Sequence, residues 1–187
     1  MFFCVAFFAQ NGCTQHKHTG KKHHTKAAVS TEIVPFSAVN ADAKAELNAV
    51  LSAYLTLKNA LAADNGNAAQ TAAKTLFAAI DAVEMAKLQG KQHEFWMTYS
   101  PKLSYDAEHI KATTEIEHQR EHFLPLSKNM YAITKAYKMA DRETYYQHCP
   151  MANNGKGADW LSTEPEVVNP YMGSKMLTCG KVTETIK

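Results

Sequence analysis

Apolar residues recur at three- and four-residue steps through the middle of the chain, the period of an amphipathic helix. A first helix is predicted over residues 42–63, with its apolar face formed by Leu47, Val50, Leu51, Tyr54, Leu55 and Leu61. A second helix follows the turn at residues 64–67 and ends near Gly90. The many alanines on its inner face favour a close approach of neighbouring helices.

Two further helical segments are predicted, one beginning near Gln92 and another reaching about Met139. Pro101 and Pro125 fall inside these segments. Because proline lacks the N–H that a helix interior needs, a kink or a restart is predicted at Pro101 and a kink or a local turn at Pro125. Helices of this length joined by short turns pack best side by side in opposite directions. The fold class expected is therefore all-α, an antiparallel bundle of about four helices.

The pattern changes in residues 144–187, which are rich in proline, glycine and asparagine and also carry aromatic and sulfur-containing side chains. An irregular stretch of this length in a compact domain is more often functional than a simple connection. A short hairpin is expected around residues 166–182. Together with the helices, this segment completes a single predicted domain over residues 41–187.

The first residues differ from everything that follows. An apolar run over residues 1–9 precedes Cys13, a small residue stands directly before that cysteine, and the sequence then turns polar. This pattern favours a signal segment, residues 1–12, with Cys13 as the lipid-modified residue of an exported protein. The alternative is an ordinary cleaved signal. A periplasmic or outer-membrane-anchored location is expected, with membrane contact through the lipid alone.

Composition and charge argue against a membrane-spanning protein and against a nucleic-acid-binding protein. Hydrophobic residues make up 45% of the 187 residues, and no apolar stretch approaches the 18 residues of a membrane span. Residues 14–26 hold four lysines, so the formal charge of +2 leaves about −2 for the rest of the chain. That balance argues against nucleic-acid binding. Residues 13–40 are expected to be a tether whose histidines bind copper(II), nickel or zinc weakly or serve only as a soluble spacer: His16, His18, His23 and His24.

Sulfur residues gather at both ends of the C-terminal segment. Their thiolate and thioether donors prefer soft ions such as copper(I) and silver(I). The candidate ligands are Cys149 and Cys179 together with the nearby His148, Met151, Met172 and Met176. The alternative is a disulfide between Cys149 and Cys179, which is common in an oxidising compartment. Methionines also fill irregular cores without any metal.

The segment Cys149–Gly180 carries a specific combination of motifs. It reads Cys-Pro-Met-Ala, then Gly-x-x-Trp-Leu-Ser, then Asn-Pro-Tyr-x-Gly-x-x-Met-x-x-Cys-Gly, and the stretch 117–127 reads Glu-His-Gln-Arg-x-x-Phe-x-Pro-Leu-Ser. Together they resemble an uncharacterised helical domain of exported Gram-negative lipoproteins, which is also appended to periplasmic adaptor subunits of copper/silver efflux systems. The resemblance runs from about residue 45 to the end. It implies heavy-metal handling and an efflux adaptor or another copper-handling protein as partner. It also implies Cys149, Met151, Met176 and Cys179 as ligands, with His148 and Met172 as weaker members.

Histidines in the helical part offer a second possibility. His118 and His122 lie four residues apart, so on a helix they share a face and can hold a metal ion together. More often such a pair is solvated or hydrogen-bonded. His109 and Arg120 are expected to form ion pairs with Asp106 inside the bundle and to orient the C-terminal segment.

Two functions follow from these patterns. The first is a copper(I) or silver(I) binding protein that sequesters the ion or hands it to an efflux system. The second is a disulfide-stabilised envelope scaffold that binds another protein and no metal. An enzyme is not expected, because the sequence has no glycine-rich phosphate loop, nucleophile elbow or paired-acid motif. Cys149 beside His148 is a weak nucleophile candidate, since sequence neighbours rarely adopt the geometry of an activated thiol.

Overall fold

The computed structural model describes residues 1–2, 32–139 and 143–187. Contacts divide the chain into residues 1–31 and residues 32–187, and the second of these is the folded body. The expected signal segment, the lipidation site Cys13 and the tether histidines His16, His18, His23 and His24 lie outside the described residues. Among the described residues, no helix is both long enough and apolar enough to cross a membrane.

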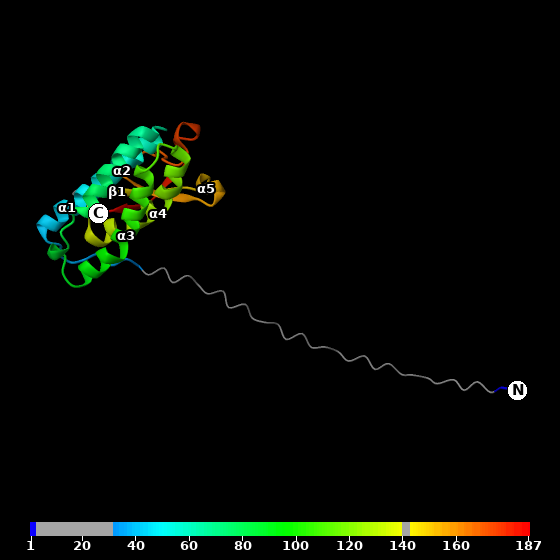
Figure 1. Ribbon diagram of the computed structural model, residues 1–187, viewed down its shortest axis with the longest axis horizontal. Coiled ribbons are helices and arrows are strands. Elements are labelled where there is room, and N and C mark those ends of the chain that lie inside the picture. Colours follow the sequence, from blue (N-terminus) through cyan, green and yellow to red (C-terminus); the bar gives the residue numbers. More distant parts are fainter. Residues whose placement is uncertain (3–31, 140–142) are drawn as a thin grey trace. The chain divides into compact units, whose positions relative to one another are not determined.

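Four long helices form most of the body (Figure 1). They are α1 (Ala41–Ala62), α2 (Gly66–Asp81), α3 (Lys91–Lys111) and α4 (Ile116–Tyr137), with a short 3-10 turn, η1 (Met85–Lys87), between α2 and α3. The Asn40 side chain caps α1 by accepting the backbone N–H groups of Asp42 and Ala43 at 2.9 and 3.2 Å. Each helix packs against the next, and α4 closes the bundle against α1.

Both internal prolines are accommodated within continuous helices. Pro101 lies in α3 and Pro125 in α4, and neither divides its helix. The expected restart at Pro101 and local turn at Pro125 are therefore wrong. Both proline side chains are exposed, and the surrounding apolar residues of each helix are buried in the shared core. Packing over a whole helix offsets the loss of one backbone hydrogen bond.

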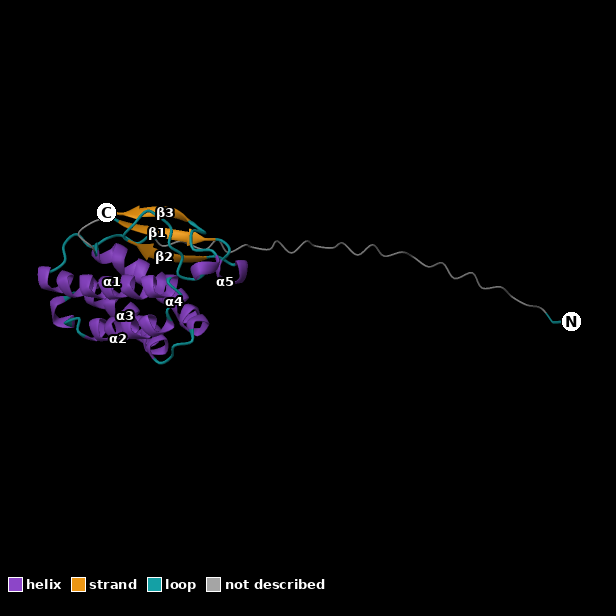
Figure 2. Cartoon of the chain, turned by 90° about the horizontal axis from the view of Figure 1, so that it is seen from above, coloured by secondary structure: helices purple, strands orange, loops and turns teal. Residues whose placement is uncertain are grey.

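A small sheet covers one face of the bundle, so the fold is mostly helical but not purely all-α. Its strands are β1 (Thr144–Cys149), β2 (Ala158–Ser162) and β3 (Lys181–Ile186), in the antiparallel order β2-β1-β3. Figure 2 shows the strands as a layer on the side of α1 and α4, with α2 and α3 beyond. The hairpin expected at residues 166–182 is wrong, because nearly all of that stretch is a loop containing the short turn η2 (Gly173–Lys175).

The sheet is fixed to the helices by a buried polar contact among apolar side chains. The hydroxyl of Tyr54 on α1 accepts the backbone N–H of Leu161 on β2 at 3.1 Å and lies 2.8 Å from the Ser127 hydroxyl on α4. Around it, Trp160 and Phe123 are fully buried. The sheet and the bundle therefore share one core.

A second anchor joins the C-terminal loop to the bundle through Arg120 of α4. This buried guanidinium donates to the carbonyl oxygens of Pro170 and Leu61 at 2.8 and 2.9 Å and to the Asp64 carboxylate at 2.5 Å. Asp64 in turn accepts the backbone N–H of Ser174 at 2.8 Å. The expected ion pair of Arg120 within the bundle is present, although its partner is Asp64 rather than Asp106, and Arg120 contacts the C-terminal segment, as expected.

Candidate metal centre

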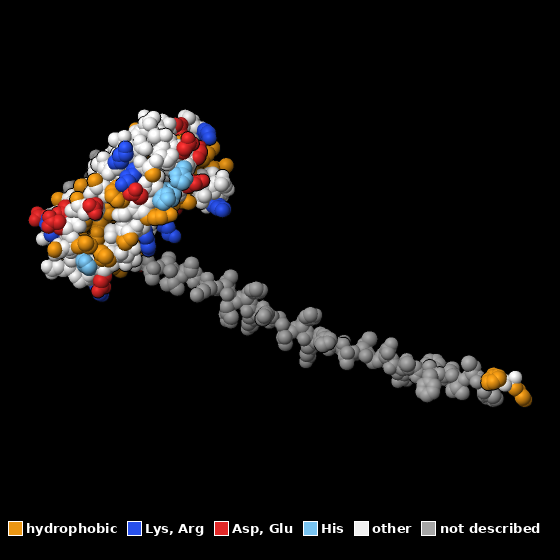
Figure 3. Space-filling view, in the orientation of Figure 1, with side chains coloured by type: hydrophobic (Ala, Val, Ile, Leu, Met, Phe, Trp, Pro, Cys, Tyr) orange, Lys and Arg blue, Asp and Glu red, His pale blue; other side chains and the backbone are white. Residues whose placement is uncertain are grey.

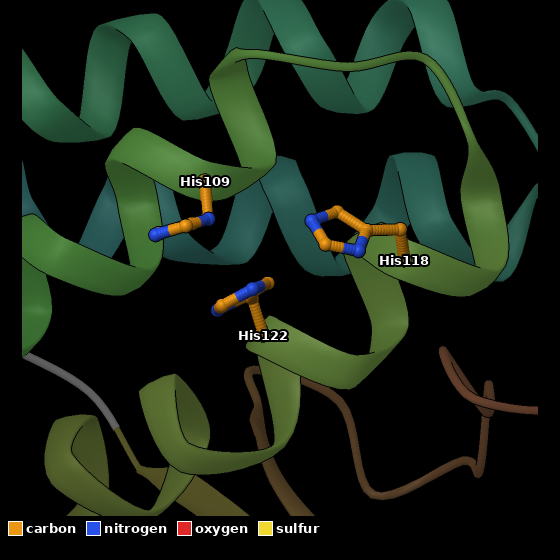
Figure 4. Close-up of side chains that lie close together, drawn as sticks. All are labelled: His109, His118 and His122. Atoms are coloured by element: carbon orange, nitrogen blue, oxygen red, sulfur yellow. The ribbon is translucent and has the colours of Figure 1, made fainter.

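Three histidines meet where α3 ends and α4 begins. His109 belongs to the last turn of α3, and His118 and His122 lie one turn apart near the start of α4. The two helices run in opposite directions and are joined by residues 112–115, so these ends are neighbours. Figure 4 shows the three rings pointing toward one another from the two helices. The rings of His109 and His122 stack with centroids 4.3 Å apart, and those of His118 and His122 are 4.9 Å apart.

The spacing of the ring nitrogens suits a metal ion. One nitrogen from each histidine can be chosen so that all three lie within 4.8 Å of one another. Two nitrogens bound to one tetrahedral ion at zinc-like bond lengths lie about 3.3 Å apart. Rotation of the exposed His118 and the half-buried His109 can close the difference while His122 keeps its contact with Asp106. Figure 3 shows histidine side chains gathered on the surface beside acidic ones, so an ion reaches them from solvent.

A buried carboxylate supports one member of the cluster. Asp106 is 4% exposed, and its Oδ1 lies 3.2 Å from Nδ1 of His122. Burial raises the pKa of Asp106, while the His122 hydrogen bond and the nearby His109 oppose that rise. With Asp106 ionised, its carboxylate only accepts, and the His122 tautomer that donates the Nδ1 hydrogen leaves Nε2 for a metal. This arrangement is the usual support of metal-binding histidines.

Two exposed side chains border the cluster. The Tyr105 ring lies 4.5 Å from the His109 ring and 5.9 Å from the His122 ring. The Glu121 carboxylate lies 3.7 Å from Nδ1 of His118 and is largely exposed. Glu121 can therefore neutralise a charged His118 or swing toward a bound ion.

The two predicted cysteine ligands also meet, although in a different geometry. Cys149 is buried at the end of β1, Cys179 is half-buried before β3, and their Sγ atoms are 2.7 Å apart. Two thiolates on one tetrahedral ion lie about 3.8 Å apart, whereas disulfide sulfurs lie about 2.0 Å apart. The contact with Cys149 raises the pKa of Cys179, aided by burial, and the Met151 backbone N–H opposes this. The geometry suits disulfide formation better than joint binding of an ion.

The structure does not bring the remaining predicted ligands, one histidine and three methionines, together at one site. His148 adjoins Cys149 in β1, so its side chain leaves the opposite face of the strand, and its Nδ1 lies 2.7 Å from the Asp159 carboxylate. The structure therefore does not bring His148 to the cysteine pair. Met151 and Met172 line one cavity, whose lining does not include Met176.

His109 is the ligand candidate that the sequence interpretation missed, since it was assigned to an ion pair. A usable signal was present: it stands in the last turn before a short connection, and His118 stands in the first turn after it. Two antiparallel helices place such positions side by side.

One comparison with known proteins gives a match. Residues 50–142 match the family model described as protein of unknown function (DUF3347). The matched stretch covers most of α1 and all of α2 to α4, including His109, His118, His122 and Asp106, and it ends before the Cys149–Gly180 motifs. No curated protein and no solved structure matches the chain.

Proposed function

We propose that this protein binds a transition-metal ion, copper foremost, between the adjoining ends of α3 and α4. The observation that carries the proposal is the convergence of His109, His118 and His122, with ring nitrogens within 4.8 Å of one another. The hydrogen bond from His122 to the buried Asp106 supports it, because ring orientation is then set before the ion arrives.

Copper is favoured for two reasons. Imidazole suits zinc, copper, iron and nickel, and copper(II) binds most tightly among the divalent ions of this series. The resemblance to domains of copper and silver efflux systems points to the same metal. Three protein ligands leave a coordination position open, which a donor from an efflux adaptor or another copper-handling protein would take during hand-over. We further propose that the protein sequesters or delivers copper outside the cytoplasm, and that a lipid on Cys13 anchors it to the membrane.

Replacing His109, His118 or His122 by alanine is expected to weaken copper(II) binding at least about a hundredfold, because loss of a direct ligand exceeds the 10- to 100-fold effect of losing a supporting group. Competitive titration against a chelator of known affinity measures this. All proteins in the series carry asparagine at His16, His18, His23 and His24, so the N-terminal histidines contribute nothing. His93→Ala, which removes a half-buried histidine of α3 outside the cluster, is the matched control. Equal affinities for the three variants and the control would refute the site.

Replacing Asp106 by alanine is expected to weaken copper(II) binding about 10- to 100-fold, since His122 then loses the acceptor that orients it. Asp106→Asn keeps an acceptor oxygen and should retain most of the affinity. The same chelator titration, with circular dichroism to verify folding, separates the two variants. An Asn variant as weak as the Ala variant would show that hydrogen-bond orientation is not the role of Asp106.

A second candidate function is a disulfide-stabilised envelope module that binds another protein without a metal. The short separation of the Cys149 and Cys179 sulfur atoms favours it. A copper(I) or silver(I) site built on Cys149, Met151, Met176 and Cys179 requires the two thiolates to move apart and stay reduced. The copper titration decides between metal binding and this alternative.

A further inference from the structure

A cavity of about 370 Å³ lies between α4 and the C-terminal segment, apart from the cluster of three histidines. From α4 it is lined by Glu117, Arg120, Glu121 and Leu124, which recur at helical spacing on one side of the helix. His118 and His122 leave the same helix toward α3. Side chains from the first turns of α4 therefore contribute to two separate sites. One is the histidine cluster on the side of α3, and the other is this cavity on the side of the C-terminal segment.

Two methionines line this cavity from separate parts of the C-terminal segment. Met151 precedes the short helix α5 (Ala152–Gly155), and Met172 precedes η2. Met151 is 55% exposed, so solvent reaches its side chain, while Met172 is half-buried against the core. The fold brings together residues 21 positions apart, and the sulfur atoms are the only soft donors among the lining residues.

The charges around the cavity largely cancel. Glu117 lies 3.4 Å from the Arg120 guanidinium and 3.9 Å from the Lys175 ammonium. Glu121 lies 3.7 Å from the His118 ring. Because Glu117 already has two cationic partners, and both Arg120 and Lys175 line the cavity, a hard divalent ion finds little net negative charge here. Soft donors then decide which ion binds, and thioethers select monovalent soft ions such as copper(I) and silver(I).

We propose that Met151 and Met172 form a second ion site in this cavity, for a monovalent soft ion, and that it operates while Cys149 and Cys179 are oxidised. A thioether is uncharged and loses no proton on binding, and disulfide formation leaves it intact, whereas oxidised cysteines are lost as thiolate ligands. Glu121 borders both this cavity and His118. The inference does not depend on the histidine site.

Silver(I) titration of the oxidised full-length protein in chloride-free buffer tests the proposal. The protein carries asparagine at the four N-terminal histidines, alanine at His109, His118 and His122, and serine at Cys4 and Cys13. Two-dimensional NMR of labelled methionine methyl groups reports on each of the eight methionines separately. The Met151 and Met172 signals are expected to shift together at low silver ratios.

The matched variants are Met151→Leu/Met172→Leu and Met176→Leu. The double variant should bind silver(I) more than about tenfold more weakly, since it loses both direct ligands. Leucine conserves volume, so the thermal transition should change little. Met176 is also exposed but does not line the cavity, and its variant should titrate like the parent. Unshifted Met151 and Met172 methyl signals, or equal affinities for the double variant and parent, would overturn the proposal. Because the histidine ligands are already removed, a failure here is distinct from a failure of copper(II) binding.

Discussion

Replacing Arg120 with alanine is expected to lower the free energy of unfolding by about 3–5 kcal/mol, because its buried guanidinium donates hydrogen bonds to Leu61, Pro170 and Asp64 at once. The carbonyl oxygens of Leu61 and Pro170 lose the guanidinium donor, and Asp64 loses its ion-pair partner. Both carbonyls belong to buried residues, so water replaces the donor poorly. The loss also frees the C-terminal loop from the bundle.

Urea denaturation followed by tryptophan fluorescence measures this change, since Trp160 lies in the core shared by sheet and bundle. Lys128→Ala is the matched control: it removes an exposed cation from the same helix and should stay within about 0.5 kcal/mol of the parent. A loss below about 1 kcal/mol for Arg120→Ala would show that the network contributes little beyond ordinary surface contacts.

Asp64 gives the same network a pH dependence with a definite sign. Hydrogen bonds from Ser174, and then from Arg120, hold the pKa of Asp64 well below its ordinary value. A lowered folded-state pKa means that stability is present above the unfolded pKa of about 4 and is lost as pH falls below it. The parent should therefore exceed Asp64→Asn in stability at neutral pH, and the difference should shrink between about pH 4 and pH 2. Asp64 is partly exposed, so solvent screening reduces the size of the effect.

Reduction of the Cys149–Cys179 pair is expected to lower the free energy of unfolding by about 3–4 kcal/mol relative to the oxidised protein. A disulfide between these positions closes a loop of about 30 residues and restricts the unfolded chain accordingly. The loop contains β2, η2 and both residues of the thioether site, Met151 and Met172. The sulfur atoms already lie 2.7 Å apart, so oxidation requires little movement of the backbone.

Urea denaturation with and without reductant measures the difference, in a protein carrying serine at Cys4 and Cys13. Mass spectrometry after treatment with oxidised glutathione counts the remaining thiols. Cys149→Ala/Cys179→Ala is the control, and its stability should not respond to reductant. Two free thiols persisting in oxidising buffer would contradict the disulfide and restore the thiolate site for copper(I) as the better interpretation of this pair.

The sequence by itself determined the helices, because a helix buries a face that repeats every three or four residues and needs no distant partner. The predicted first helix, residues 42–63, agrees with α1 at Ala41–Ala62 to within one residue at each end. The same local pattern indicated the shared face of His118 and His122. Two of its alternatives are wrong, the restart at Pro101 and the local turn at Pro125, because packing along the rest of α3 and α4 outweighs one lost backbone hydrogen bond.

Only the tertiary structure decided the sheet and the sites. Strand β1 is stabilised by residues 158–162 on one side and 181–186 on the other, and such pairing leaves no local period in the sequence. His109 joins His118 and His122 because antiparallel packing brings two helix ends together. Arg120 finds Asp64, 56 residues away, rather than Asp106. Met151 and Met172 line one cavity because the folded core brings two distant segments together. The sequence specifies which side-chain chemistry is available, and the tertiary structure decides which side chains meet.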